Sequence, residues 1–96
     1  MRCVWDDSKN AANQRKHGLS FDEAQKLFAG DGDYLEIFDE AHSEDEDRFV
    51  AIGAISRGVV LVVYVELSEE WLRIISARWA TKREMQMFRG WKASRK

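Results

Sequence analysis

Four side chains of this 96-residue sequence are best suited to chemistry on a phosphate group: Arg48, Arg73, Arg78 and His17. A guanidinium keeps its positive charge and carries a planar fork of donors that matches the oxygens of a phosphate. An imidazole titrates near neutral pH and can accept or donate a proton. These residue types favour an anionic ligand that arginine holds while a histidine moves a proton.

His17 is expected at the C-terminus of a first helix, where the helix dipole favours the imidazolium. Two interpretations stay open: His17 is an acid–base group, or it only caps the helix by binding a last carbonyl. The residue alone favours the cap. Lys16 beside it is expected to be a solvated cation that can also contact phosphate. His42, inside an acidic segment, is expected to be exposed and inert.

Arg73 and Arg78 belong to one predicted strand, yet their positions differ by an odd number. Side chains alternate along a regular strand, so the two would lie on opposite faces of the sheet. Only a β-bulge, or an Arg78 beyond the end of the strand, would bring both to one site. The alternative is that one arginine pairs with an internal acid such as Glu46 or Asp47.

Charge is distributed unevenly along the chain. Residues 1–30 carry +1, residues 31–70 carry −10 and residues 71–96 carry +7, which sum to the formal net charge of −2. The basic end favours an anionic partner, nucleic acid first. Three interpretations of the acidic segment 39–47 stay open. It is a binding site for a basic segment of a partner protein, a region whose negative charge keeps an anionic ligand on the positive side, or an ordinary solvated loop.

Three helices are predicted from capping patterns. The first is expected between Asp6, as N-cap, and Gly18, as the left-handed residue at its end. The second and third begin with the spacing of a capping box, at Ser20–Glu23 and at Thr81–Glu84. The second helix is expected to end near Gly30.

Four strands are predicted where the apolar period changes from 3.6 to two. Their expected ranges are 34–39, 48–55, 59–66 and 71–78. Short connections require antiparallel neighbours. The run 59–66 has apolar side chains at both its odd and its even positions, which face opposite sides of the sheet, so this strand is expected in the centre. The fold class is therefore α+β, one domain over residues 1–96, with two N-terminal helices, an antiparallel meander of about four strands and a C-terminal helix.

Several classes of protein are excluded by composition. No apolar run approaches the roughly 20 residues that span a bilayer, and the N-terminus lacks the apolar region of a secretory signal. The single cysteine, Cys3, forms no internal disulfide and suits a reducing cytoplasm. Cys3, His17 and His42 lack the spacing of metal ligands. A cytoplasmic protein without a metal or cofactor is expected.

Three blocks of sequence resemble the BrnT family, the toxins of bacterial BrnT/BrnA type II toxin–antitoxin systems. They are WDDSKNAANQRKHGLSFDEA (5–24), HSEDEDRFVAIG (42–53) and RIISARWATKRE (73–84). The resemblance covers about residues 4–88. It implies a RelE-like fold, ribonuclease activity that arrests translation, and neutralisation by a BrnA antitoxin. It also implies that the antitoxin carries a ribbon-helix-helix DNA-binding domain, through which the complex represses its own operon.

Metal-free RNA cleavage by such a toxin would use the 2′-hydroxyl as nucleophile, with acid–base groups and cations around the phosphate. The expected catalytic residues are His17, Arg48, Arg73 and Arg78. The family match raises the acid–base interpretation of His17 to parity with the capping one. Further candidates for RNA contact are Lys9, Lys16, Lys82, Arg83 and Trp79.

The chain departs from the family pattern at two positions. Asp7 stands where the family usually has proline, and Trp79 stands where it is more often basic. Trp79 and Trp71 can add stacking platforms for bases, whereas Trp5 is expected in the core. These departures leave open a degenerate toxin that serves only as a co-repressor without nuclease activity. A separate alternative is a non-catalytic module that holds a DNA-binding partner on an operator.

Overall fold

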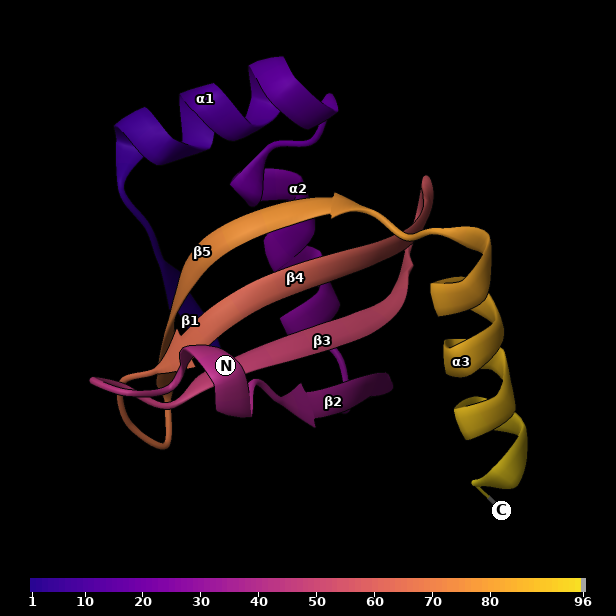
Figure 1. Cartoon of the computed structure of the whole chain (residues 1–96). Coiled ribbons are helices and arrows are strands. Elements are labelled where there is room, and N and C mark those ends of the chain that lie inside the picture. The colour runs from indigo at the N-terminus through magenta and orange to yellow at the C-terminus, as the bar shows by residue number, and fades with distance from the viewer. Residues whose placement is uncertain (96) are drawn as a thin grey trace.

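Five strands form one mixed sheet in the order β1-β5-β4-β3-β2 (Figure 1). The computed structural model describes residues 1–95. Its strands are β1 (Arg2–Val4), β2 (Tyr34–Phe38), β3 (Arg48–Ile55), β4 (Gly58–Glu66) and β5 (Trp71–Trp79). Its helices are α1 (Asp7–His17), α2 (Phe21–Ala24) and α3 (Lys82–Ser94), with 3-10 turns η1 (Gln25–Phe28) and η2 (Glu40–His42).

The predicted meander of β2, β3, β4 and β5 is confirmed, with β4 in its centre. The prediction of about four antiparallel strands missed β1, which pairs in parallel with β5 through the register Arg2↔Trp71 to Val4↔Arg73. A three-residue strand is too short to show a period of two. Its partner is also distant in sequence, since Arg2 pairs with Trp71. No turn between neighbouring segments could therefore predict this pairing.

The helix starts follow the predicted caps. The Asp6 carboxylate accepts hydrogen bonds from the backbone of Ser8 and Lys9, and Gly18 ends α1 with a φ of 65°. Thr81 and Glu84 form the complete capping box of α3. The second helix is shorter than predicted, since α2 has four residues and continues as the 3-10 turn η1 instead of reaching Gly30 as one helix.

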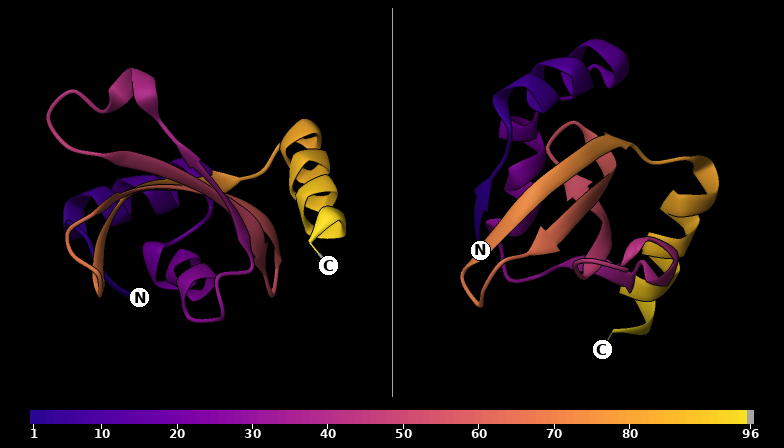
Figure 2. Two further views of the ribbon diagram at one scale, coloured as in Figure 1. Left: turned by 90° about the horizontal axis from the view of Figure 1, so that it is seen from below. Right: turned by 60° about the vertical axis from the view of Figure 1, so that its left-hand side comes forward.

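Two apolar clusters lie on opposite faces of the sheet. On the first, here called the core face, α2 and η1 pack Phe21, Leu27 and Phe28 against β4 and β5. On the second, here called the open face, Phe88 and Trp91 of α3 cover Ile52 and Leu61. In the left view of Figure 2, the loop between β2 and β3 rises on the side of the sheet away from α2. The open face is therefore bordered by this acidic loop and by α3.

No helix within residues 1–95 is long and apolar enough to cross a membrane.

Candidate functional site

A β-bulge in β5 places Arg73 and Arg78 on the same face of the sheet. Val63 pairs with Ser76 whereas the next residue, Tyr64, pairs with Ile74, so Ile75 is an extra residue in β5. The extra residue reverses the parity of the strand. Arg73 then shares the open face with Arg78, whose partner Leu61 belongs to the α3-covered cluster. The bulge required for a shared site is present.

Arg48 and Arg73 lie in one row across the sheet, because both are register partners of Val65. Two inter-strand spacings separate their backbones, which is about 10 Å. Arg78 pairs with Leu61, four residues along β4 from Val65, so it lies about 13 Å further along the sheet. The structure brings Arg48 and Arg73 together at one end of the open face and places Arg78 at the other.

Arg73 and Arg78 each form an internal ion pair. Nη2 of Arg73 lies 2.6 Å from a carboxylate oxygen of Glu46, which confirms the alternative that one arginine pairs with that acid. Arg78 binds Glu84 through two hydrogen bonds of 2.8 and 2.9 Å, and these lower the pKa of Glu84 to about 2. Both arginines remain partly exposed, so an anion can compete for them.

Arg48 differs from the other two arginines, since its guanidinium has no ion-pair partner within residues 1–95. Its buried Nε also lacks a hydrogen-bond partner in this part of the chain. The backbone at Arg48 is fixed, because its amide donates to Oγ of Ser43 over 3.0 Å and its carbonyl accepts from the amide of Asp39 over 2.8 Å. A buried donor without a partner is a strong position for an anion.

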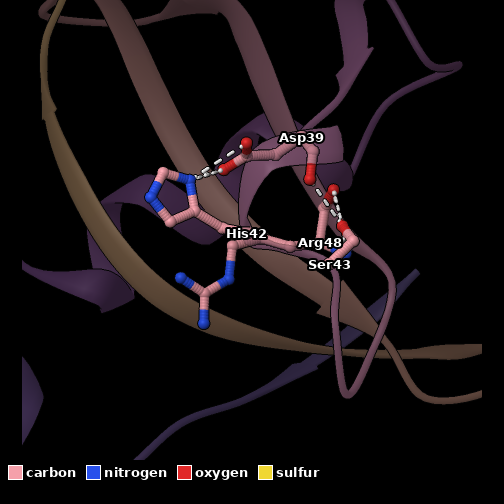
Figure 3. A network of polar contacts seen from close by, with 4 residues as sticks. All are labelled: Asp39, His42, Ser43 and Arg48. Atoms are coloured by element: carbon pink, nitrogen blue, oxygen red, sulfur yellow. Dashed lines mark hydrogen bonds and ion pairs between the residues drawn. The ribbon is translucent and has the colours of Figure 1, made fainter.

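A cavity of about 340 Å³ opens beside Arg48. It is lined by Ala41, His42, Glu44, Asp45, Glu46 and Arg48. His42 is exposed, as predicted, but it is not isolated: its Nδ1 lies 3.0 and 3.1 Å from the two carboxylate oxygens of Asp39 (Figure 3). The sequence signal for this pair is an aspartate three residues before a histidine in a turn.

His17 is half-buried at the end of α1. The helix is held at the edge of β5 by Asn13, whose side-chain amide bonds both the carbonyl and the amide of Ala77. His17 follows Asn13 by one helical turn, and the carbonyl of Gly18 accepts from Arg57 in the β3–β4 turn. His17 therefore belongs to the Arg78 end of the sheet, and the structure does not bring it together with Arg48 and Arg73.

The candidates for RNA contact fall into three places. Lys9 and Lys16 are exposed on α1, and Lys82 and Arg83 are exposed in the first turn of α3. Trp79 lies on the core face, where it packs against the apolar cluster.

The tryptophans differ in how much ring surface they leave free. The guanidinium of Arg57 lies 5.0 Å from the ring centroid of Trp79, so one ring face is already occupied. Trp71 is more exposed and has Arg2 over its ring at 5.5 Å. Trp5 packs edge-on against Phe21, as its predicted place in the core requires.

Comparison with known proteins identifies the family. Residues 5–84 match the family model described as the ribonuclease toxin BrnT of type II toxin–antitoxin systems. The chain belongs to this family. As a member of the BrnT family, it is a ribonuclease toxin. The matched residues include α1, the whole sheet from β2 to β5 and the start of α3.

A solved structure agrees with this assignment. The 1.1 Å crystal structure of the Brucella abortus ribonuclease toxin BrnT is similar to this chain with a TM-score of 0.65 and 26% sequence identity. The match covers 85% of this chain and 99% of the Brucella protein. No curated protein matches the sequence.

Proposed function

We propose that this BrnT-family chain is a metal-independent endoribonuclease that inhibits translation and takes RNA on the open face of its sheet. Arg48 and Arg73 would contact the scissile phosphate, and Arg78 would contact a neighbouring phosphate of the same RNA. A BrnA-like antitoxin with a ribbon-helix-helix domain would neutralise the toxin, and the complex would repress its own operon. Contact with operator DNA would be indirect, through the antitoxin. With RNA as substrate, the protein would act in the cytoplasm.

The observation that carries the proposal concerns Nε of Arg48, in the same row as Arg73: it is buried and has no hydrogen-bond partner in the part of the chain that the structure describes. Two arginines whose backbones lie about 10 Å apart can contact one phosphodiester when their side chains extend toward each other. Fixed positive charge at a phosphate that gains negative charge in the transition state is a large source of catalysis. No metal ion is needed for this electrostatic role.

The path of the RNA beyond this row follows the remaining cations. Arg78 lies about 13 Å along the same face, a distance of about two nucleotides, and Lys82 and Arg83 follow it on α3. Lys9 and Lys16 on α1 extend the positive surface past the β5 edge. Trp79 lies on the core face, so it would contact RNA only where the RNA strand passes the β5 edge, with the ring face that Arg57 leaves free.

His17 is retained as an acid–base candidate for a phosphate held by Arg78, at whose end of the sheet it lies. It cannot serve a phosphate held by Arg48 and Arg73, because a proton acceptor must lie within hydrogen-bond reach of the reacting hydroxyl.

The antitoxin is proposed to dock on the edge of β2 and the acidic loop beside it. Strand β2 is the last in the sheet, and Ile37 and Phe38 expose apolar surface there. The segment 39–47 adds six carboxylates directly after the strand. A basic segment of the antitoxin would match this charge, while RNA would be kept to the positive part of the molecule.

A second function, a non-catalytic module that binds the antitoxin, is favoured by the two internal ion pairs. Glu46 and Glu84 neutralise two of the three arginines in the absence of RNA. If these pairs are purely structural, the chain holds its partner and does not cut RNA.

Expression of the chain alone and purification for a cleavage assay separate the two functions. The ribonuclease proposal predicts growth arrest that co-expression of the adjacent antitoxin gene relieves, and RNA cleavage that persists in EDTA. Arg48→Ala should reduce cleavage more than Arg2→Ala, which removes a cation from the far edge strand β1. Intact RNA together with tight binding of the antitoxin would favour the non-catalytic module. Cleavage that EDTA abolishes would overturn metal independence.

The repressor role needs a separate measurement. The toxin–antitoxin complex should shift operator DNA in a gel, the antitoxin alone should shift it through its own domain, and the toxin alone should leave it free. A shift by the toxin alone would contradict indirect contact with DNA.

A further inference from the structure

The acidic loop holds a histidine–aspartate pair next to Arg48, whose side chain has no ion-pair partner among residues 1–95. Both carboxylate oxygens of Asp39 approach Nδ1 of His42, at 3.1 and 3.0 Å. His42 and Arg48 line the same cavity, and Figure 3 shows the imidazole and the Arg48 guanidinium on the same side of the η2 turn. The three groups come from one short stretch of chain that closes back on the start of β3.

Ser43 holds this stretch in place. Its Oγ donates to the carbonyl of Asp39 over 2.6 Å and accepts from the amide of Arg48 over 3.0 Å. The backbone of Asp39 also donates to the carbonyl of Arg48 over 2.8 Å. The side chains of Asp39, His42 and Arg48 are therefore attached to a backbone that is fixed at both ends, as a catalytic group requires.

The aspartate selects the tautomer of the histidine. An ionised carboxylate only accepts hydrogen bonds, so Nδ1 of His42 carries the proton that it donates to Asp39. In neutral imidazole the other nitrogen, Nε2, then has a free lone pair. The His42 side chain is 67% exposed, which leaves Nε2 accessible to a substrate. This is the arrangement of a general base whose orientation is set by an acid.

We propose that His42, oriented by Asp39, is the general base of RNA cleavage at a phosphate bound by Arg48. The inference rests on the proposed ribonuclease function and names its base. Nε2 of His42 takes the proton of the 2′-hydroxyl, and the 2′-oxygen forms a bond to phosphorus. The P–O5′ bond breaks with its electron pair on O5′, which takes a proton from water. The products are a 2′,3′-cyclic phosphate and a 5′-hydroxyl, and His42 returns its proton to the hydroxide that remains.

The charges around the cavity favour a single phosphate beside Arg48. They disfavour a path of the RNA backbone across the acidic loop. Asp39 holds the imidazole of His42 in place through the contacts of its two carboxylate oxygens with Nδ1. Glu44, Asp45 and Glu46 repel the flanking phosphates on the loop side. Arg48 lies on the sheet side of the cavity, and Arg73 becomes available when RNA displaces Glu46. The scissile phosphate would therefore sit at the border between the acidic loop and the basic part of the open face.

Asp39 is assigned as a positioning residue, because it acts through His42. Asp39→Asn would keep a polar group of the same size but replace one of the two carboxylate oxygens beside Nδ1 of His42 with an amide nitrogen. It should lower kcat and leave KM for RNA nearly unchanged, since it does not contact the substrate. A purely structural role would instead lower the fraction of folded protein and leave the kcat of the folded part intact.

The test compares two substitutions of His42 in the full-length purified chain. His42→Asn keeps a donor close to the position of Nδ1 and can preserve the bond to Asp39, but has no proton acceptor at the position of Nε2. His42→Ala opens a space that added imidazole can enter. Both variants should lose about 10²–10⁴-fold in kcat, and imidazole should restore part of the activity of His42→Ala. Glu69→Gln, which removes an exposed charge from the turn between β4 and β5, outside the cavity and the acidic loop, is the control and should cleave at the wild-type rate.

Each result decides between the inference and the function beneath it. Wild-type cleavage together with full activity of His42→Asn would overturn the role of His42 and leave the ribonuclease proposal standing. A loss confined to His17→Ala would do the same and assign the acid–base role to the Arg78 end. A wild-type protein that leaves RNA intact would remove the proposed function itself. If added imidazole did not restore cleavage by a folded His42→Ala variant, the role of His42 would be structural and not catalytic.

Discussion

At the scale of single residues, carboxylates control how much positive charge the open face presents. Arg73 and Arg78 look equivalent in sequence, since both belong to the RIISAR block. Their pairs differ in the structure: Glu46 comes from an exposed loop, whereas Glu84 also closes the capping box of α3. The Arg73 pair is therefore the easier one to exchange for a phosphate, and Arg78 is the more structural of the two.

The exchange at Arg73 can be measured with Glu46→Gln. Both partners of this pair are 40% or more exposed, so its loss should change the free energy of unfolding by less than about 1 kcal/mol. The freed guanidinium should strengthen binding of a non-cleavable 2′-O-methyl RNA by several-fold in fluorescence anisotropy. Glu40→Gln removes the same charge from the same loop without freeing an arginine. Equal gains in both variants would show that only net charge matters.

The Arg78–Glu84 pair makes a prediction about pH. Because Arg78 lowers the pKa of Glu84 from 4.5 to about 2, the ionised form is favoured in the folded state. Its contribution to stability is complete above pH 4.5 and is lost as the pH falls through about 2. Glu84→Gln should be less stable than wild type at pH 7, by about 1 kcal/mol given the partial exposure of the pair. Urea unfolding at a series of pH values should show this difference shrinking toward pH 2, and a constant difference would contradict the assignment.

At the scale of elements, Asn13 joins the first helix to the sheet. The amide of this buried residue bonds the carbonyls of Leu19 and Ala77 and the backbone amide of Ala77. Strand β1 covers β5 only as far as Arg73, so Asn13 takes the place of a neighbouring strand at Ala77.

Replacing Asn13 tests this attachment. Asn13→Ala leaves the backbone groups of Ala77 buried without partners, which should cost about 2–3 kcal/mol of unfolding free energy in urea. Gln14→Ala, at the exposed next position of the same helix, should change stability by less than about 0.5 kcal/mol. Equal effects of the two substitutions would show that the loss comes from helix propensity alone.

Gly53 tests how closely η1 packs on the sheet. A Cβ at this position would lie 2.6 Å from Cδ1 of Leu27 and 2.9 Å from Cβ of Tyr34. Gly53→Ala should therefore destabilise the protein by about 1–3 kcal/mol. Gly30→Ala has open space around the new Cβ and an ordinary φ, and thermal unfolding should show little change. A Gly53→Ala protein as stable as wild type would show that η1 is free to move away.

Much of this architecture could be predicted from local sequence. Helix caps and the alternation of apolar residues each depend on a few neighbouring positions. The caps predicted α1 and α3, and the alternation predicted the four strands of the meander. Two features depend on packing between distant parts of the chain: the parallel strand β1, and the continuation of the second helix as a 3-10 turn. A local sequence pattern could therefore not predict them.

The candidate site was less predictable than the fold. Two of its features, the bulge at Ile75 and the return of the acidic loop onto Arg48, are set by sheet register and by Ser43. The sequence identified the three arginines as residue types suited to phosphate. It could not show that, of these three, Arg48 is the one without an acidic partner within residues 1–95, or that His42 lies beside it while His17 lies at the other end of the sheet.

At the scale of the whole molecule, charge is sorted by position rather than balanced locally. The acidic loop and the basic C-terminal region meet at the open face, and the meeting point is the Arg48–Arg73 row. A protein with a net charge of −2 would repel RNA at long range if that charge were spread evenly. Sorting lets one surface attract RNA while another is free to attract a basic antitoxin.

Binding of RNA on the open face can be observed in an NMR titration of the protein with a 2′-O-methyl RNA that cannot be cleaved. Binding there should shift the Nε–H signals of Arg48 and Arg73 and the methyl signals of Val50 and Val63 on the open face. Signals of the core-face residues Phe21 and Phe28 should move little. Shifts confined to α1 and the core face, with Arg48 and Arg73 unchanged, would contradict the claim that RNA binds on the open face.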